Sequence, residues 1–185
     1  MEKILLYGLD DQSAEMIGNA GKQLGIAVCR IGDSALFHKV ADLFEAGSDQ
    51  DTQARAFDNE YMIMQEMDSG KLYALLDELE KQQYEFEGIK VMRTDTNENW
   101  TLFQLLQETG KEHRIQKKVI ILREMLMSCN TLDLSVLPQG EKESFRQVLM
   151  DAFVLYQSGT YTDKELDECI HQLSDSLKKI RKLYS

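Results

Sequence analysis

Acidic residues follow each of four short apolar runs, at positions where carboxylates could hold a cation. Asp10 and Asp11 follow the first run, Asp33 the second, Asp68 the third and Asp95 the fourth. If these runs are parallel strands, their carboxyl ends lie at one edge of a sheet, where such sheets bind ligands. Carboxylate oxygens are the ligands that Mg²⁺ prefers in proteins. The sequence therefore offers Asp10, Asp11, Asp68 and Asp95 as candidate metal ligands, with Mg²⁺ as the one cofactor suggested.

Helix capping is the competing interpretation of the same acidic residues. An Asp at the start of a helix accepts hydrogen bonds from free backbone N–H groups, which stabilises the helix by about 1 kcal/mol. Each acidic position precedes a predicted helix, so capping explains all of them without a shared site. It accounts least well for the neighbouring Asp10 and Asp11, because one cap needs only one carboxylate. We favour capping and keep the metal site as the alternative.

A dense polar segment, residues 94–101, reads TDTNENWT and connects the fourth predicted strand to a helix. Loop amides at a helix N-terminus can hold a small anionic ligand. The candidate ligand-binding residues are therefore Thr94, Thr96, Asn97, Asn99, Trp100 and Thr101. The carboxylates of Asp95 and Glu98 oppose an anion, and we favour the alternative that the Asn and Thr side chains form turns.

The end of this segment has the pattern of a helix start. Thr101 and Gln104 form a T-x-x-Q capping box, and Trp100 and Leu105 occupy the hydrophobic positions that flank such a box. Trp100 is therefore predicted to clamp the helix start rather than to stack on a ligand.

The sequence carries none of the common catalytic signatures. It has no G-x-G-x-x-G, P-loop, G-x-S-x-G or H-E-x-x-H motif. Its three cysteines, Cys29, Cys129 and Cys169, are widely spaced and form no C-x-x-C pair, which indicates reduced, buried thiols. We therefore lean towards a noncatalytic regulatory or protein-interaction module.

Apolar periodicity predicts alternating strands and helices in the first part of the chain. The expected strands are 4–7, 26–31, 61–67 and 86–93, and the expected helices are 13–24, 35–46, 71–83 and one that starts at 101. This order predicts an α/β fold with a four-stranded, largely parallel sheet flanked by helices. A ferredoxin-like α+β arrangement, with residues 35–60 as an insertion, is the alternative. No internal repeat is evident at the periods of solenoid proteins.

A change in composition near Gly110 predicts a boundary between an α/β domain, residues 1–110, and a helical extension, residues 111–185. Within the first domain, the acidic segment at about 48–60 is predicted to be mobile. The last helix has apolar residues at heptad-like spacing: Leu166, Ile170, Leu173, Leu177, Ile180 and Tyr184. This seam predicts either packing on a neighbouring helix or a homodimer. The C-terminal helices are therefore the expected site for a protein partner.

The charge of the chain argues against two classes of partner. The formal net charge is −11, whereas nonspecific binding of nucleic acid or of an anionic membrane needs clustered cations. No apolar run approaches the roughly 18 residues of a membrane-spanning helix. The N-terminus does not resemble a signal peptide, because its apolar run stops at Gly8 and meets Asp10. We expect a cytoplasmic protein that binds neither nucleic acid nor membranes.

The stretch from Glu60 to His113 resembles a small bacterial domain-of-unknown-function family (family number 3783). The similarity lies in the order strand, Leu-rich helix, strand, and in a T-x-T-N-x-N-W-T motif. The matching residues are Ile89, Lys90, Val91, Thr94, Thr96, Asn97, Asn99, Trp100, Thr101, Glu112 and His113. Asp95 stands where the family commonly has proline. The resemblance implies no activity and no catalytic residues.

A fainter similarity links the chain to receiver-type domains. Asp10, Asp11 and Lys90 could be placed as the acid pair and the lysine of such a domain. The chain departs from that pattern, because it has only four predicted strands and no clear phosphoacceptor Asp. Asp68 is the nearest candidate for that role.

Overall fold

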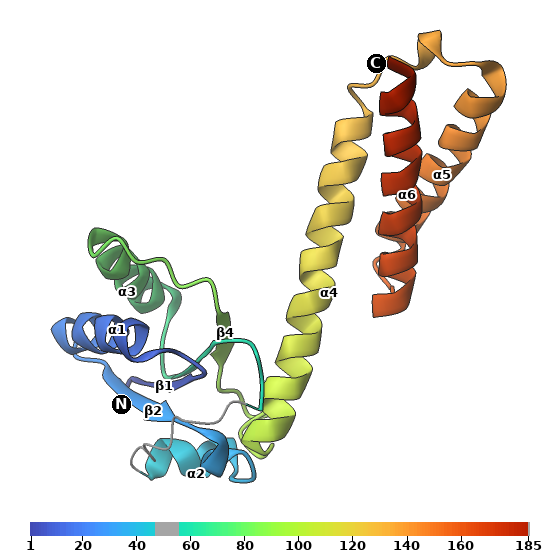
Figure 1. The fold of residues 1–185 in the computed structure, drawn as a ribbon. Helices are drawn as coiled ribbons and strands as arrows, with labels where there is room; N and C mark the ends of the chain where they lie inside the picture. Colours follow the sequence, from blue (N-terminus) through green and yellow to red (C-terminus); the bar gives the residue numbers. More distant parts are fainter. Residues whose placement is uncertain (47–55, 185) are drawn as a thin grey trace. The chain divides into compact units, whose positions relative to one another are not determined.

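The structure is a computed structural model that describes residues 1–46 and 56–184, and it shows an α/β fold (Figure 1). Within those ranges the strands are β1 (Lys3–Tyr7), β2 (Ala27–Ile31), β3 (Tyr61–Gln65) and β4 (Ile89–Met92). The α-helices are α1 (Asp11–Gln23), α2 (Val40–Glu45), α3 (Ser69–Lys81), α4 (Leu102–Cys129), α5 (Gln139–Ser158) and α6 (Asp163–Tyr184). Two short 3₁₀ helices, η1 (Asp33–Ala35) and η2 (Leu134–Val136), complete the elements. Most of the acidic segment predicted to be mobile, up to residue 55, lies outside the described residues.

The four strands form one mixed sheet in the order β2-β1-β3-β4. β1 pairs parallel with β2, β3 pairs parallel with β4, and the central pair of β1 and β3 is antiparallel. The predicted α/β class and largely parallel sheet are confirmed. The strand pairs β1–β2 and β3–β4 each have a helix, α1 or α3, as their connection, as parallel neighbours require.

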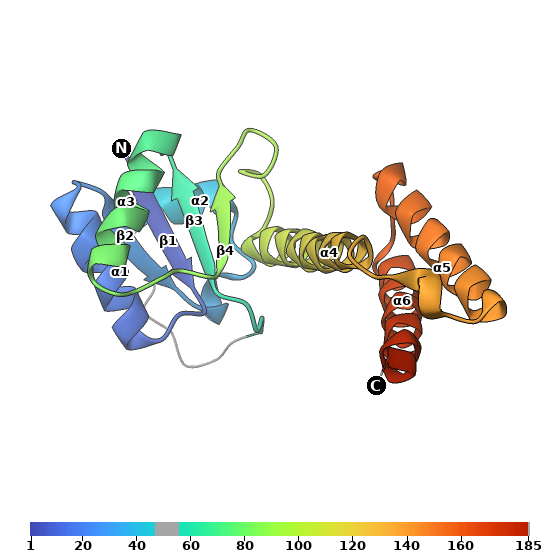
Figure 2. The same ribbon diagram turned by 90° about the horizontal axis from the view of Figure 1, so that it is seen from above.

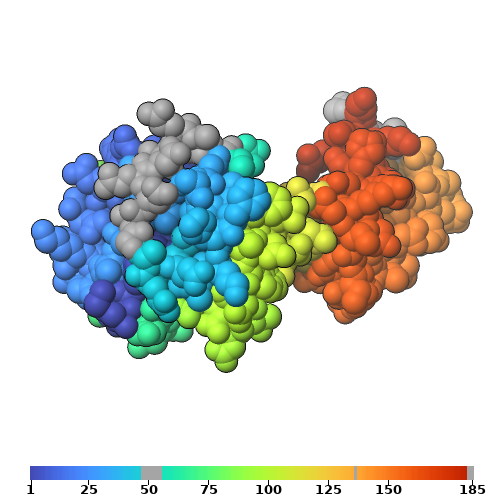
Figure 3. All heavy atoms as spheres, turned by 90° about the horizontal axis from the view of Figure 1, so that it is seen from below, coloured from blue at the N-terminus to red at the C-terminus, as the bar shows by residue number. Residues whose placement is uncertain are grey.

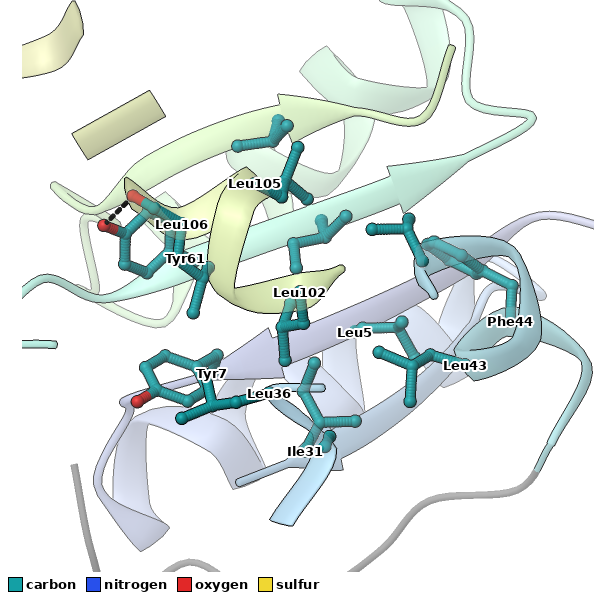
Figure 4. Packing of buried hydrophobic residues seen from close by; sticks show 14 of the residues in the cluster. Leu5, Tyr7, Ile31, Leu36, Leu43, Phe44, Tyr61, Leu102, Leu105 and Leu106 are labelled. Atoms are coloured by element: carbon teal, nitrogen blue, oxygen red, sulfur yellow. Dashed lines mark hydrogen bonds between the residues drawn. The ribbon is translucent and has the colours of Figure 1, made fainter. Parts of the chain in front are cut away.

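Both faces of the sheet are buried. The side chains of each strand alternate between the two faces, so one strand contributes to both clusters of buried residues. Ile4 and Leu6 of β1 point to the face covered by α1 and α3, and Leu5 and Tyr7 point to the opposite face. Figure 2 shows α1 and α3 on the same side of the sheet. The second face is covered by α2 and the first turns of α4, whose Leu102, Leu105 and Leu106 are fully buried there (Figure 4).

The helix predicted at 35–46 is shorter than expected, because its first half pairs with another segment. Leu36 O accepts a hydrogen bond from Phe103 N, and His38 O accepts one from Leu102 N, both at 2.9 Å. These carbonyls therefore cannot serve a continuous helix, and only η1 and α2 form. Figure 3 shows the α2 region and the start of α4 side by side on one surface.

The chain divides into two compact units, Met1–Gly110 and Lys111–Ser185, here called unit 1 and unit 2. The division falls inside α4, which continues through Gly110 without a break. Gly110 lies against Tyr61, whose Oη would be 2.7 Å from a Cβ added at Gly110. Tyr61 Oη donates a hydrogen bond to Leu106 O, 2.9 Å away and one helical turn earlier (Figure 4). A side chain larger than hydrogen at position 110 would disturb this contact.

Unit 2 consists of the rest of α4 with α5 and α6, packed around an apolar core. Four residues of the heptad-like seam of α6 are buried in this core: Leu166, Leu173, Leu177 and Ile180. The seam therefore packs on neighbouring helices within the unit. A capping box of Thr162 and Glu165 starts α6, in which Thr162 N donates to Glu165 Oε2 at 2.7 Å. Across residues 1–46 and 56–184, no helix is long and apolar enough to cross a membrane.

Candidate functional site

The loop of residues 94–101 is held together by hydrogen bonds among its own side chains and backbone. Thr94 N donates to Asn97 Oδ1 at 2.8 Å, and Asn97 N donates back to Thr94 Oγ1 at 3.3 Å. Asn97 Nδ2 also donates to Met92 O at the end of β4, at 2.9 Å. These bonds are the turn-forming contacts expected of Asn and Thr in a polar loop. They occupy Asn97, the most central of the candidate ligand-binding residues.

The end of the loop starts α4 as the sequence predicts. Thr101 N donates to Gln104 Oε1 at 3.0 Å, and Gln104 N donates to Thr101 Oγ1 at 3.2 Å, which completes a capping box. Trp100 is half-buried and packs against the core of unit 1. The indole is therefore part of the fold at the helix start.

The backbone of the loop also binds the neighbouring helix. Glu98 O accepts a hydrogen bond from Ala41 N, and Trp100 O accepts one from Val40 N, both at 3.0 Å. These two acceptors satisfy N–H groups in the first turn of α2, which otherwise have no partner within the helix. Among the candidate ligand-binding residues, Thr94, Thr96 and Asn99 are exposed.

Two of the four candidate metal ligands cap helices. Asp10 Oδ1 accepts from Ser13 N, and Asp68 Oδ1 accepts from Lys71 N, each at 2.7 Å. Both are N-cap residues in extended backbone conformation, of α1 and α3. These contacts are the ones that the capping interpretation predicts.

The other two candidates lie apart from each other. Asp11 forms an ion pair with Arg30, with Oδ1 2.6 Å from Nη1, and Asp95 is an exposed loop residue. Because β1 and β3 are antiparallel, the carboxyl ends of β1 and β3 point to opposite edges of the sheet. Asp10 and Asp11 therefore lie at one edge, and Asp68 lies at the other. In the part of the chain that the structure describes, no three His, Cys, Asp or Glu residues are grouped to hold a metal ion.

Asp33, which follows the second predicted strand, and Lys90, which could be placed as a receiver-type lysine, have defined partners. Tyr7 Oη donates to Asp33 Oδ1 at 2.5 Å, and Ala56 N donates to the same oxygen at 3.1 Å. Burial, and secondarily this hydrogen bond to Asp33, raises the pKa of Tyr7. Lys90 Nζ donates to Phe86 O at 2.9 Å and lies 5.1 Å from the centre of the Phe86 ring. Lys90 thus binds within its own half of the sheet, on β4, which does not neighbour β1.

Unit 2 contains an open groove between α4 and α5, with a volume of about 580 Å³. Its apolar lining comes from Leu126, Met127, Leu149, Met150, Phe153 and Tyr156. Met127, Met150 and Phe153 are exposed, although they are large apolar side chains. Apolar side chains gathered in one open groove are typical of a binding surface.

Two arginines complete the lining of this groove. Arg123 comes from α4 and Arg146 from α5. Neither guanidinium forms an ion pair or hydrogen bond with another residue in the described ranges. The groove therefore combines an apolar surface with two positive charges that are available to a partner.

The sequence alone did not predict this groove. Its lining includes exposed apolar side chains of α5, among them Phe153. The signal that could have found it is Met150 one helical turn before Phe153, at positions outside the face of Phe145 and Ala152 that is buried in the core, which makes α5 apolar on more than one face. A helix that is apolar beyond one stripe has more surface to bury than its own unit covers.

The three cysteines, all among the described residues, form no disulfide with one another, and one of the three is buried. Cys129 is buried, and Cys29 and Cys169 are half-buried. Burial raises the pKa values of Cys129 and Cys169, so both favour the neutral thiol over the nucleophilic thiolate.

Comparison with known proteins relates one part of the chain to a family model. No curated protein and no solved structure matches the sequence. Residues 60–115, which contain β3, α3, β4 and the start of α4, match the model of a domain of unknown function, DUF3783, and this confirms the resemblance inferred for Glu60 to His113.

Proposed function

We propose that the protein is a noncatalytic interaction module that binds an acidic amphipathic helix of a partner protein in the groove between α4 and α5. We further propose that it acts in the cytoplasm, where its free thiols would stay reduced. The observation that carries the proposal is the exposed apolar groove with its two unpaired arginines.

The apolar part of the groove supports binding of a helix. Met127 is on α4, Met150 and Phe153 are on α5, and the three line the same groove. A partner helix places its apolar residues at intervals of three and four positions, which lets them enter a groove of this kind. Methionines suit such a surface, because their flexible side chains adapt to the shape of the partner.

The charged part of the groove supports an acidic partner. The chain carries a net charge of −11, so two unpaired arginines at an apolar groove stand out against its general charge. Carboxylates on the flanks of a bound helix could pair with Arg123 and Arg146, and charge complementarity of this kind selects partners. A basic helix of the same apolar pattern would be repelled.

The test uses two designed peptides with the same apolar pattern, one with Glu and one with Lys on the flanks of the helix. We expect the full chain to bind the Glu peptide and not the Lys peptide in titration calorimetry. Met150→Glu should weaken binding of the Glu peptide at least tenfold, or about 1.4 kcal/mol, because it places a carboxylate inside the groove. Arg146→Glu should do the same by reversing one charge.

Val154→Glu provides the matched control. Val154 is on the same helix and is 60% exposed, close to the 59% of Met150, but it does not line the groove. It should leave peptide binding unchanged. Equal binding of the two peptides, or equal loss in Met150→Glu and Val154→Glu, would contradict the proposal. A homodimer that dissociates in Met150→Glu would assign the groove to a second copy of the chain instead.

A further inference from the structure

Unit 1 is built from two halves with the same sequence of elements. The first half contains β1, α1, β2 and α2, and the second contains β3, α3, β4 and α4. β1 and β3 each have five residues, and α1 and α3 each have 13. In each half the helix connects two parallel strands that are neighbours in the sheet. The match to the family model covers only the second half.

The N-caps of α1 and α3 are equivalent. Asp10 caps α1 by accepting from Ser13 N, and Asp68 caps α3 by accepting from Lys71 N, each at 2.7 Å. The shift along the chain that carries Asp10 onto Asp68 also carries every residue of α1 onto its counterpart in α3.

Unusual backbone conformations recur at the same shift. Gly8, just after β1, has a φ of 82°, and Glu66, just after β3, has a φ of 54°. Gly25, beyond the end of α1, has a φ of 73°, and Gln83, beyond the end of α3, has a φ of 59°. Residues other than glycine rarely adopt positive φ. Glu66 and Gln83 are the two non-glycine residues with positive φ in the described ranges, and both stand where the first half has glycine.

The central strand pair has the register of a two-fold axis. Leu5 is opposite Ile63, and the shift that carries Asp10 onto Asp68 carries Leu5 onto Ile63. The pair of Tyr7 with Tyr61 at one end of these strands corresponds to the pair of Gln65 with Lys3 at the other end. An antiparallel pair in which each strand's central residue faces its own equivalent is symmetric about that point.

The segments that lead into α2 and α4 pair with each other through an antiparallel bridge between Lys39 and Thr101, and this contact, here called the α2–α4 crossing, repeats the symmetry. Val40 N donates to Trp100 O at 3.0 Å, and Leu102 N donates to His38 O at 2.9 Å. The shift here is 62 residues (40 to 102 and 38 to 100), four more than the 58 residues from Asp10 to Asp68, because the second half has a longer connection before β4. The two hydrogen bonds are therefore equivalent under the two-fold axis. The family motif at residues 94–101 is therefore part of the contact between the halves.

From these correspondences we infer that residues 1–46 are a second, diverged copy of the domain formed by residues 60–115. The two halves share few residues at equivalent positions, among them Asp10 with Asp68 and Leu43 with Leu105. The surface that joins them is the β1–β3 strand pair together with the α2–α4 crossing. Its partner is another copy of the same domain, and in this chain the N-terminal half supplies that copy.

If the two halves are copies of one domain, two copies of the second half should pair with each other once the first half is removed. A protease site is placed within residues 47–55 of the full chain, and the chain is cut there. The cut protein should keep the mass of both fragments together, because the strand pair and the helix crossing join them. The fragments are then separated in urea, and the C-terminal fragment is refolded alone. We expect it to form a dimer with twice the mass of the fragment.

A crosslink at the symmetry axis identifies the mode of pairing. In a symmetric dimer, position 63 of one copy faces position 63 of the other, whereas position 62 faces position 64. Fragments carrying Ile63→Cys or Met62→Cys are compared, with Cys129 and Cys169 replaced by alanine in both. Both substituted positions are fully buried, so the variants are matched in burial. Ile63→Cys should give a disulfide-linked dimer on oxidation, and Met62→Cys should not.

Refolding the C-terminal fragment with the separated N-terminal fragment shows whether it can still fold. If it recovers the mass and circular dichroism of the cut protein with that partner but stays monomeric or unfolded alone, self-pairing is excluded and the inference is overturned. Equal crosslinking at positions 62 and 63 overturns it as well. Met150→Glu in the same fragment separates this inference from the proposed function. The pairing does not involve the groove between α4 and α5, so this variant should leave the mass of the dimer unchanged.

Discussion

Unit 1 and unit 2 differ in how completely they bury their apolar side chains. In unit 1 the sheet is covered on both faces, by α1 with α3 and by α2 with the first turns of α4, and the apolar side chains of its central strands β1 and β3 are buried, whereas Phe37 and Tyr73 outside the sheet are exposed singly. In unit 2 the helices bury one core but leave Met127, Met150 and Phe153 exposed beside two unpaired arginines. We infer from this difference that the second half of unit 1 finds its partner within the chain, in the first half, whereas we propose that unit 2 binds a partner from outside.

The largest effect that separates the two units should come from shortening one side chain in each. Leu105 is fully buried in unit 1, so Leu105→Ala should destabilise unit 1 by about 2–5 kcal/mol through lost burial and a residual cavity. Met150→Ala in the groove of unit 2 should change stability by less than about 0.5 kcal/mol, because Met150 is largely exposed. Denaturant unfolding followed by Trp100 fluorescence reports unit 1, and circular dichroism reports the helices of both units. A similar loss of unfolding free energy in both variants would mean that the groove residues are packed as tightly as the core of unit 1, and the two units would then not differ in this respect.

A glycine at the end of unit 1 should give the next largest effect. Alanine in place of glycine inside a helix normally stabilises it by about 1 kcal/mol. At Gly110 the added Cβ would lie 2.7 Å from Tyr61 Oη, so Gly110→Ala should instead destabilise unit 1, by about 1–3 kcal/mol. Gly140 of α5 has no atom within 4 Å of an added Cβ, and Gly140→Ala should be neutral or mildly stabilising.

A double variant tests the cause of the effect at Gly110. Combining Gly110→Ala with Tyr61→Phe removes the hydroxyl that meets the new methyl group, at the loss of the bond to Leu106 O. The double variant should be less destabilised than the sum of the two single variants in the same unfolding experiment. Strict additivity would show that the clash is absent, and with it the close packing of α4 on β3.

The sequence predicted the strands and helices of unit 1 because short apolar runs and capping residues are local signals. Asp10 and Asp68 are caps, and Thr101 with Gln104 is a capping box, as expected. Strand direction is a property of pairing, so the sequence could not show that β1 and β3 are antiparallel. This is why Asp10 and Asp68, which looked like neighbours at one sheet edge, lie at opposite edges.

The relation between the two halves of unit 1 was hidden for a related reason. Backbone conformation is preserved at Gly8 and Glu66, and at Gly25 and Gln83, while the residue type has changed. A comparison of residue types therefore finds little, whereas strand register and backbone angles reveal the repeat. The groove of unit 2 was missed because its residues come from α4 and α5, whose packing fixes which apolar side chains remain outside.

The smallest effects concern the two equivalent caps and bear on both the metal hypothesis and the repeat. Asp10→Ala and Asp68→Ala should each destabilise unit 1 by about 1 kcal/mol, because each leaves N–H groups of a first helical turn without an acceptor. Asp95→Ala, at an exposed loop position, should change stability by less than about 0.5 kcal/mol. Thermal unfolding of the four proteins, with and without Mg²⁺, measures all of these effects together. If the carboxylates only cap helices, Mg²⁺ shifts none of the melting temperatures. A Mg²⁺-dependent rise in the wild type that disappears in Asp10→Ala would instead assign Asp10 to a metal site, because a ligand stabilises the state that binds it.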